Sequence, residues 1–289
     1  MHVSTVCKYN QARSIIGAAA IRTIFPEISV FSAGVQATDT LVPEQVRMIA
    51  QRWGIPVEEK FSTAVSSSVK ILTNSDLIIA ADEEVAYLLG ENVKNKSLVN
   101  LQEVATAIEF TPHDPTGMQG AQMDIELAKV VALTIQEVIT FLKLRTKNEI
   151  VALIPRTPQA EACTLAFAHE ANGANGFIID LNLRTPDKNM WKEQAVPVSL
   201  IKGEFTKELA KIIAAKNRKQ RKGIEIFAPA FEISNPESVW LSRDLVDLIL
   251  KMSEIAHVTI LTAPLILPNA PLADAYFAAI TAKRVEVIS

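Results

Sequence analysis

The amino-acid sequence predicts an α/β protein of two three-layer domains, each built on a mainly parallel sheet. The chain has 289 residues, which is enough for two domains of ordinary size. Short apolar segments alternate with longer segments of helical periodicity, a pattern typical of parallel sheets covered by helices. A charged stretch at 143–148 separates two such series, so we expect domains at 1–147 and 148–289.

The first half alternates strands and helices along the chain. Apolar alternation predicts a strand that ends at Cys7, and the stretch rich in alanine and isoleucine at 15–24 predicts a helix after it. We expect further strands at 29–32 and 77–81 and helices at 42–52, 83–90 and 123–144. Strands separated by helices form a parallel sheet with helices on both faces.

The second half begins with a new apolar strand at 150–154. Further strands are expected from 176 onward and at 258–261 and 284–288, and the Asn-Pro-Glu stretch at 235–237 opens a helix. This half therefore also has the alternation of an α/β domain.

Composition excludes several classes of function. The net charge is −3 with both signs interspersed, so no nucleic-acid partner is expected. The two cysteines, Cys7 and Cys163, indicate a reducing cytoplasm rather than a disulfide framework. The four histidines form no metal-ligand spacing with them, so neither a metal nor a cofactor is expected. No apolar stretch is long enough to span a bilayer, so we expect no direct membrane insertion.

The pairing of Cys7 with Arg13 carries the strongest chemical signal. A thiol at the end of a strand, before a loop that opens a helix, lies where backbone N–H groups converge on an anion and stabilise a thiolate. The planar guanidinium of Arg13 matches two phosphate oxygens. Together they predict a cysteine phosphatase. The alternative for Cys7 is a small buried apolar side chain at a strand end.

Three further features extend this signal: Ser14 directly after the arginine, Ser-Ala-Gly at 32–34, and Asp114 in an Asp-Pro pair. With them, roughly the first half of the chain resembles the low-molecular-weight protein tyrosine phosphatase family. The resemblance implies that Cys7 is the nucleophile, that Arg13 clamps the phosphate and that Asp114 is the general acid and then the base. It also implies that Ser14 donates a hydrogen bond to the thiolate and that Asn10 holds the loop.

The implied reaction passes through a phosphocysteine, which divides one difficult displacement into two easier ones and needs no metal. The phosphate-binding loop implied by the resemblance consists of Lys8, Tyr9, Asn10, Gln11, Ala12, Arg13 and Ser14.

Three positions depart from the family pattern. Tyr9 stands where the family has glycine, so we expect an altered or strained loop there, because a positive φ is costly for a bulky residue. Ala12 replaces a second cysteine that serves reversible disulfide protection. Thr116 replaces an aromatic residue that stacks on the substrate, and Tyr9 is the candidate to supply an aromatic wall instead.

The second half resembles the nucleotide-binding domain of bacterial tyrosine autokinases, which are related to MinD-type ATPases. The resemblance lies in the segments 155–164, 176–186 and 258–264. The phosphate loop of that family needs glycines and a lysine, which position the backbone and hold the phosphates. Gln159 and Glu161 stand at the glycine positions and Ala162 at the lysine position.

The acidic positions of the resemblance are also altered. Asp180 is retained, but Asn182 stands at the second acidic position of its segment, and Leu261 stands where the metal-organising aspartate belongs. We therefore expect neither ATP binding nor kinase activity from this half.

The resulting hypothesis is a cytoplasmic protein tyrosine phosphatase that regulates exopolysaccharide or capsule production, with an inactive kinase-like half as a docking domain. The expected partners are a phosphotyrosine protein substrate and a bacterial tyrosine kinase; the oligomeric state stays open. The alternatives are a pseudoenzyme scaffold, a second half that only stabilises the first, and an arsenate reductase, which would need cysteines beyond Cys163. The basic run at 216–222 predicts either a docking patch or a solvated helix end.

Overall fold

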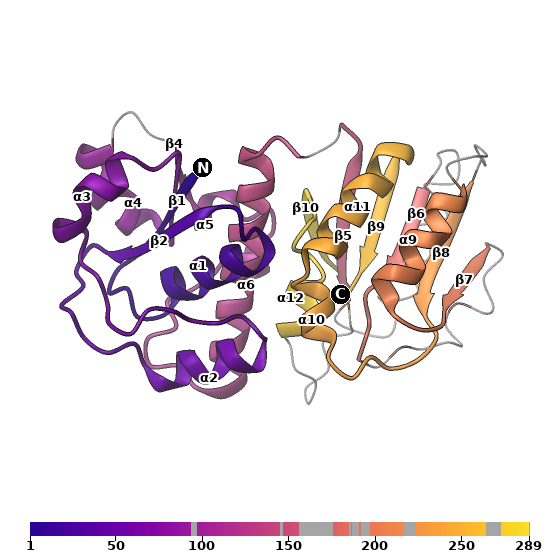
Figure 1. Cartoon of the computed structure of the whole chain (residues 1–289), viewed down its shortest axis with the longest axis horizontal. Coiled ribbons are helices and arrows are strands. Elements are labelled where there is room, and N and C mark those ends of the chain that lie inside the picture. Colours follow the sequence, from indigo (N-terminus) through magenta and orange to yellow (C-terminus); the bar gives the residue numbers. More distant parts are fainter. Residues whose placement is uncertain are drawn as a thin grey trace. The chain divides into compact units, whose positions relative to one another are not determined.

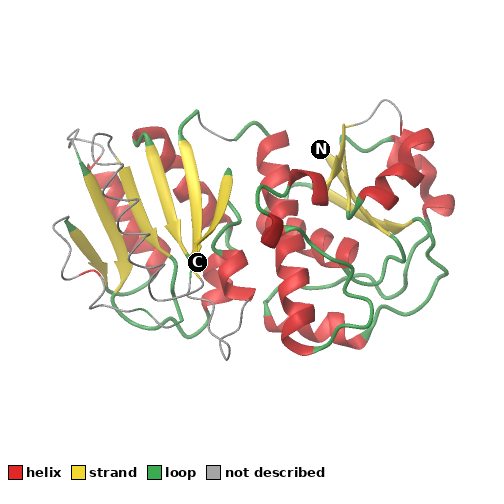
Figure 2. Cartoon of the chain, turned by 180° about the vertical axis from the view of Figure 1, so that it is seen from behind, coloured by secondary structure: helices red, strands yellow, loops and turns green. Residues whose placement is uncertain are grey.

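The computed structural model describes residues 1–93, 97–144, 147–155, 176–184, 186, 191, 197–216, 223–263 and 273–288. The chain divides into two compact units, Met1–Lys143 and Leu144–Ser289. Each unit combines helices with a sheet whose strands all pair in parallel within the described residues (Figures 1 and 2). The predicted α/β class with mainly parallel sheets is confirmed.

The first unit has a four-stranded sheet of order β2-β1-β3-β4. Its elements are β1 (His2–Cys7), α1 (Arg13–Ile24), β2 (Ser29–Gly34), α2 (Glu44–Arg52), α3 (Val65–Thr73), β3 (Leu77–Ala80), α4 (Glu83–Leu89), the 3₁₀ turn η1 (Gly90–Val93), β4 (Ser97–Asn100), α5 (Leu101–Val104), the 3₁₀ turn η2 (Ile108–Phe110) and α6 (Gly120–Phe141).

Helices cover both faces of this sheet. On one face, α3 and α4 pack on the strands through a buried apolar cluster: Val6, Ala33, Val65, Leu72, Ile78, Ala80, Val85, Leu89 and Val93. On the other face lies α1, where the Thr5 hydroxyl donates to the Ser14 carbonyl at 2.7 Å. The alternation along β1, with Thr5 toward α1 and Val6 toward the cluster, follows from the two-residue period of a strand. The long helix α6 packs against α1.

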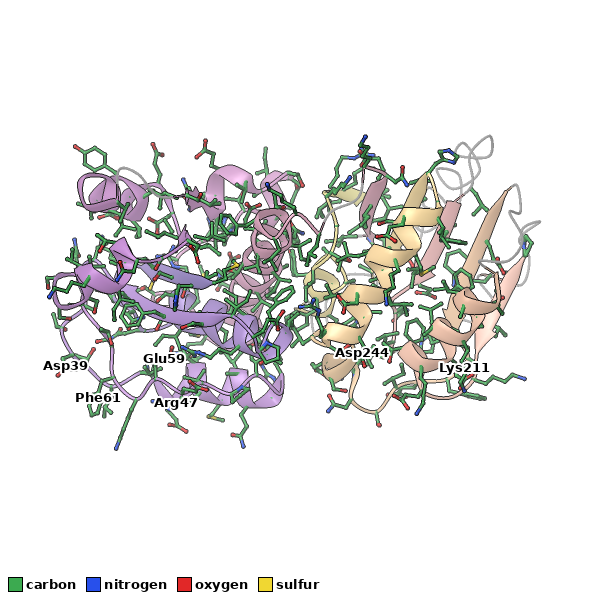
Figure 3. The ribbon with its side chains drawn as sticks, turned by 45° about the horizontal axis from the view of Figure 1, so that its top comes forward. Asp39, Arg47, Glu59, Phe61, Lys211 and Asp244 are labelled. Carbon is green, nitrogen blue, oxygen red and sulfur yellow. The ribbon has the colours of Figure 1, made fainter. Side chains whose placement is uncertain are left out.

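A segment before α3 is anchored to the helices beside it. The guanidinium of Arg47, on α2, donates to the carbonyls of Glu59 and Lys60 at 2.6 and 3.2 Å (Figure 3). The Glu59 side chain in turn forms an ion pair with Arg22 of α1 at 2.7 Å. These contacts fix the chain that leads to Thr63, which contacts the loop after β1.

The second unit has a six-stranded sheet of order β10-β5-β9-β6-β8-β7. Its elements are β5 (Glu149–Pro155), β6 (Gly176–Asp180), β7 (Val198–Ile201), α9 (Phe205–Lys216), β8 (Ile224–Pro229), α10 (Pro236–Trp240), α11 (Arg243–Ile255), β9 (Val258–Thr262), α12 (Ala273–Phe277) and β10 (Arg284–Ile288). Helices α9 and α11 lie side by side over one face (Figure 1). A buried cluster forms part of its core: Val151, Leu153, Ile178, Trp191, Ile224, Ile226, Ala228 and Ile260.

Most predicted elements of the first unit are found, with shifted ends. The helix expected at 123–144 spans Gly120–Phe141 and ends where Lys143 adopts a left-handed backbone with φ 56°. The helix expected at 42–52 begins at Glu44, and the strand expected at 29–32 continues to Gly34. Helix α3 and strand β4 were not predicted. The first is rich in serine and the second is four residues long, so neither carries a strong periodic signal.

Some predictions concern residues outside the described part of the chain. They include Gln159, Glu161, Ala162 and Cys163, and the basic run from 217 to 222. Among the described helices, none has both the length and the apolar character needed to cross a membrane.

Candidate active site

The candidate site lies at the carboxyl edge of the first sheet, between β1 and β3. After β1 the chain passes to α1 on one face, and after β3 it passes to α4 on the other face. Neighbouring parallel strands whose connections leave on opposite faces open a crevice at their carboxyl ends, where ligands bind in such folds. Cys7 ends β1 and Asp82 follows β3, so both side chains belong to this crevice.

The loop from Cys7 to Ala12 curls around the thiol. The backbone N–H of Asn10 donates to the Cys7 Sγ at 3.2 Å, and the Ser14 Oγ lies 3.0 Å from that sulfur. The Asn10 side-chain amide donates to the same Ser14 Oγ at 2.9 Å. Ser14 accepts this bond and keeps its own proton available to donate to the sulfur, so two donors can be directed at Cys7.

The backbone strain expected at Tyr9 is not there. The residue with a positive φ is Asn10, at 52°, and asparagine tolerates this conformation better than most residues. Asn10 is fully buried, and its side-chain oxygen accepts the backbone N–H of Thr63 at 2.7 Å. Tyr9 is 41% exposed at the rim of the site. The prediction of strain at Tyr9 was therefore wrong, because the left-handed residue is the next one.

Gly34, at the end of β2, sets the position of this loop. A Cβ at Gly34 would lie 2.6 Å from the Asn10 nitrogen and 2.7 Å from the Tyr9 carbonyl carbon, both far too close. The following residues hold the loop to the strand, since Val35 and Gln36 donate to the carbonyls of Cys7 and Lys8 at 3.0 and 2.7 Å. Only glycine allows this approach of two backbones.

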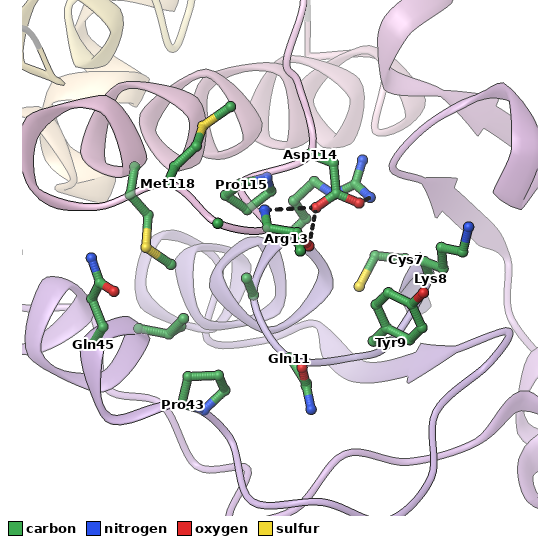
Figure 4. Close-up of a pocket in the computed structure, with 15 residues that line it drawn as sticks. Cys7, Lys8, Tyr9, Gln11, Arg13, Pro43, Gln45, Asp114, Pro115 and Met118 are labelled. Atoms are coloured by element: carbon green, nitrogen blue, oxygen red, sulfur yellow. Dashed lines mark hydrogen bonds and ion pairs between the residues drawn. The ribbon is translucent and has the colours of Figure 1, made fainter.

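Arg13 is the first residue of α1, and its side chain is only 3% exposed. Its Nη1 donates to Asp82 at 2.7 Å and its Nη2 to Asp114 at 2.9 Å. Asp82 is fixed, because its second oxygen caps α4 by accepting the N–H of Val85 at 2.9 Å. The Asp114 side chain is 42% exposed and lies in a loop (Figure 4). One carboxylate thus fixes the guanidinium while the other has room to move.

Asp114 is also held by Thr116, whose hydroxyl and backbone N–H donate to one carboxylate oxygen at 2.7 and 3.0 Å. Burial raises the pKa of Asp114, but the Thr116 hydroxyl and the nearby Arg13 guanidinium outweigh it and keep the pKa of this carboxyl below its usual value. Asp114 is therefore ionised at neutral pH before a phosphate binds.

A pocket of about 240 Å³ opens over Cys7 and Arg13. Cys7, Lys8 and Tyr9 stand on one side of it, while Pro43, Gln45 and Met118 stand on the other (Figure 4). A cavity of ~150 Å³ accommodates a benzene ring, so this pocket has room for an aryl group beside a phosphate. The lining residues are Cys7, Lys8, Tyr9, Gln11, Ala12, Arg13, Pro43, Gln45, Val46, Asp114, Pro115, Thr116, Gly117, Met118 and Met123.

Lys8 points away from the thiol toward α4. Its ammonium donates to both carboxylate oxygens of Glu84 at 3.0 and 3.1 Å, and this interaction raises the pKa of Lys8. The same ammonium lies 5.8 Å from the centre of the Tyr9 ring. Lys8 therefore contributes positive charge at the rim of the pocket rather than a contact at the sulfur.

The structure brings together the residues predicted for the site. It adds Asp82, which sequence reasoning missed and which orients Arg13. It also shows how Gly34, part of the Ser-Ala-Gly stretch, supports the loop. A signal for Asp82 was present, because an aspartate directly after a buried strand lies at the sheet edge where Cys7 lies. Within the described part of the chain, no group of three or more His, Cys, Asp or Glu side chains could hold a metal ion.

The polar residues at the corresponding edge of the second sheet are used within the fold. Asp180 is 2% exposed and accepts hydrogen bonds from the Trp191 indole at 2.7 Å, the Asn182 N–H at 2.9 Å and the Thr262 hydroxyl at 3.3 Å. Leu261 is fully buried in β9. The retained acidic residue thus has its oxygens occupied by protein donors.

Arg184, four residues after β6, forms a second cluster there. It donates to Asp274 of α12 at 2.7 Å and to Glu237 of α10 at 2.6 Å. Asp274 and then Glu237 raise the pKa of Arg184, while burial raises the pKa of Asp274 in spite of this pairing. The cluster ties two short helices to the end of a strand.

No family model matches the sequence, and no curated protein matches it. Solved structures of small phosphatases are similar to about half of the chain. A low-molecular-weight phosphotyrosine phosphatase from Vibrio cholerae is 21% identical, covers 50% of this chain and 97% of its own, and has a TM-score of 0.44. The tyrosine phosphatase Wzb from Escherichia coli K30 is 17% identical, covers 50% of this chain and 97% of its own, and has a TM-score of 0.43.

A mutant of YwlE from Bacillus subtilis is also similar. It is 20% identical, covers 50% of this chain and 99% of its own, and has a TM-score of 0.41. Another structure of YwlE is described as an arginine phosphatase.

Proposed function

We propose that the first unit is a cysteine-dependent protein tyrosine phosphatase. The observation that carries this proposal is the position of the Cys7 sulfur, which lies against the Asn10 N–H and the Ser14 hydroxyl in a pocket that Arg13 and Asp114 also line. A nucleophile, a phosphate clamp and a proton donor are the groups that phosphate-ester hydrolysis requires when no metal takes part.

The first step transfers the phosphoryl group to sulfur. The Cys7 thiolate attacks phosphorus while the bond from phosphorus to the aryl oxygen breaks, and protonated Asp114 delivers its proton to the departing oxygen. The products are a phenol, a phosphocysteine and an ionised Asp114. Arg13 and the loop N–H groups stabilise the charge on the equatorial oxygens throughout.

The second step restores the enzyme. Asp114 accepts a proton from water as the water oxygen attacks phosphorus, and the bond from sulfur to phosphorus breaks. Inorganic phosphate leaves, Asp114 is protonated again, and the Ser14 hydroxyl stabilises the returning thiolate. The same carboxyl thus serves as acid and then as base.

A phosphate that binds both Nη atoms of Arg13 would replace one of the two carboxylates that these atoms contact. Asp82 is held by the N-terminus of α4, whereas Asp114 is more exposed and lies in a loop. We expect the phosphate dianion to replace Asp114 on the guanidinium and to raise the proton affinity of that carboxyl by adding negative charge beside it. Substrate binding would thereby prepare the acid for its role.

The shape and lining of the pocket support a proposal for the substrate class. Tyr9 on one side and Pro43 and Met118 on the other offer apolar contacts to an aromatic ring. We propose phosphotyrosine in a protein as the substrate, exopolysaccharide or capsule synthesis as the process, and the cytoplasm as the location. A bacterial tyrosine kinase is the proposed partner.

We further propose that residues 148–289 are a kinase-like domain without kinase activity that docks the phosphatase on its partner. The support for the absence of kinase activity is that the Asp180 oxygens accept bonds from Trp191, Asn182 and Thr262 and that the nearby Leu261 is apolar. Calorimetric titration of the full chain with Mg-ATP is expected to show no binding; measurable binding would contradict this part of the proposal.

The deciding experiment for the activity is hydrolysis of an aryl phosphate by the wild type, Cys7→Ser and Asp114→Asn. We expect turnover by the wild type, none by Cys7→Ser, and a loss of about 10²–10⁴-fold for Asp114→Asn. No turnover by the wild type between pH 5 and 8 would overturn the proposal and favour a scaffold that only binds its partner. Phosphotyrosine, phosphoserine and phosphoarginine peptides then test the substrate class.

A further inference from the structure

The three residues before Asp114 each have a backbone polar group held by a side chain from another element. The carbonyl of Thr111 accepts from Lys129 at 3.4 Å, and the carbonyl of Pro112 accepts from Gln102 at 3.2 Å. The N–H of His113 donates to Glu126 at 2.6 Å. The backbone that carries Asp114 into the site is therefore fixed by side chains and not by secondary structure.

Two of these side chains form a buried ion pair on α6. Glu126 and Lys129 are each 6% exposed, and their charged atoms lie 2.9 Å apart. The attraction within a buried pair roughly offsets the cost of removing both charges from water, so such a pair contributes little net stability. What the pair does add is a charged acceptor for the His113 N–H and a charged donor for the Thr111 carbonyl.

The same helix is coupled to the phosphate-binding loop. Helix α6 packs on α1, and a Cβ on Gly17 of α1 would lie 3.2 Å from the Thr134 hydroxyl of α6, so the two helices approach closely. Arg13 begins α1, while Glu126 and Lys129 lie on α6. Both halves of the site are thus attached to one pair of packed helices.

We propose that Glu126, whose charge its buried partner Lys129 neutralises, is a positioning residue that holds Asp114 at the leaving oxygen. This inference rests on the proposed role of Asp114 as the general acid. The strongest contact, from the His113 N–H to Glu126, is one residue from that carboxyl. An error of about 1 Å in the position of a reacting group costs up to ~10²-fold in rate, so a loose loop would impair proton transfer without preventing phosphate binding.

The test compares two double variants of the full chain, Glu126→Leu/Lys129→Met and Glu126→Gln/Lys129→Met. Both remove the ion pair, but only the glutamine variant keeps an oxygen that accepts the His113 N–H. Asp124→Asn is the control on the same helix, because the Asp124 carboxylate pairs with Arg52 and not with the residues just before Asp114. Thermal unfolding establishes that each variant is folded.

The measured quantity is kcat/KM for a series of aryl phosphates, from 2,4-dinitrophenyl phosphate to phenyl phosphate. It reports the step in which the aryl oxygen leaves, and a basic leaving group needs the acid whereas dinitrophenolate does not. We expect the leucine variant to lose roughly 10- to 100-fold on phenyl phosphate and less than about twofold on the dinitrophenyl ester. The glutamine variant and Asp124→Asn should follow the wild type.

The outcomes separate this inference from the proposed function. The positioning role is wrong under the following outcome. Asp114→Asn loses kcat/KM mainly on phenyl phosphate, as expected when the general acid is missing, but the leucine variant keeps the wild-type kcat/KM on both phenyl phosphate and the dinitrophenyl ester. An equal loss on every ester would also overturn it, because it would show a general structural defect. If the wild type hydrolyses none of the esters, the proposed function itself fails.

Discussion

Two arginines occupy similar places in the two units, each following a strand of a parallel sheet and each lying between two carboxylates. Arg13 contacts Asp82 and Asp114, and Arg184 contacts Asp274 and Glu237, all at 2.6–2.9 Å. The difference lies in the carboxylates. The Asp274 and Glu237 side chains are 6% and 12% exposed and belong to helices, whereas the Asp114 side chain is 42% exposed and belongs to a loop.

This difference separates a structural brace from a site that can bind an anion. An incoming phosphate needs an arginine whose carboxylate partner can leave without breaking the fold, and Asp114 meets that condition. Around Arg184, both partners hold α10 and α12 against the end of β6, so releasing either would cost packing. Similar ion pairs thus have different uses, according to whether the carboxylate partner is buried in a helix or exposed in a loop.

Replacing each arginine by lysine tests the comparison most directly, and the largest effect is expected at Arg13. Lysine cannot form the forked contact with phosphate, so Arg13→Lys should lower kcat/KM for an aryl phosphate by about 10²–10³-fold. Arg184→Lys should leave kcat/KM unchanged and lower the free energy of unfolding by about 1–2 kcal/mol. A comparable loss of activity in Arg184→Lys would show that the second cluster takes part in the reaction.

Gly34 allows the loop to be displaced without changing any of its side chains. Gly34→Ala adds a methyl group where the Asn10 and Tyr9 backbones lie within 3 Å, so the loop must shift. A shift of about 1 Å should reduce kcat/KM by up to ~10²-fold. Gly90→Ala is the matched control, because a Cβ at Gly90 meets nothing within 4 Å. Full activity in Gly34→Ala would mean that the loop tolerates displacement.

In the second unit, a stability measurement tests whether Asp180 is structural. Trp191→Phe removes the indole N–H that donates to the buried Asp180 carboxylate, and the loss of a hydrogen bond to a buried charged group costs about 1–3 kcal/mol. Chemical denaturation should show this loss, while hydrolysis of aryl phosphates stays unchanged. An unaltered free energy of unfolding would indicate that Asp180 does not depend on the indole.

A substitution at Thr116 is expected to have the smallest effect, and it tests the Asp114 carboxylate itself. Asp114 must be protonated to act as the acid, so kcat/KM falls as the pH rises through its pKa. Thr116→Val removes the hydroxyl that stabilises the ionised Asp114 carboxylate, so the pKa of Asp114 should rise. The fall of kcat/KM with rising pH should then occur at higher pH than in the wild type. The profile of kcat/KM against pH with phenyl phosphate measures this, with Thr73→Val as control. A shift to lower pH would contradict the assignment.

The sequence predicted the parts of the fold and site that depend on contiguous residues. The parallel strands follow from short apolar runs, and the loop from Cys7 to Arg13 is one uninterrupted segment whose chemistry can be inferred residue by residue. Helix α3 and strand β4 could not be predicted, because a serine-rich helix and a four-residue strand lack a clear period of apolar residues.

What could not be predicted depends on distant parts of the chain. Asp114 was identified only through a family resemblance, since an Asp-Pro pair by itself indicates a turn. Glu126 and Lys129, three residues apart on a helix, have the pattern of an ordinary surface pair, and only the packing of α6 reveals that they are buried. The strain assigned to Tyr9 belongs to Asn10, because a pattern of residue types does not fix φ to the exact residue.

The ion pairs of Arg13 have a consequence for folding. They join residues 69 and 101 positions apart in the chain, so the site closes only after most of the first unit has been built. Contacts between such distant residues form late and slow the folding of a domain, because long loops must be closed before the contacts stabilise anything. Hydrolysis of an aryl phosphate would therefore report completed folding: it should appear only after the sheet and α6 have assembled, even though Cys7 and Arg13 precede most of these elements in the chain.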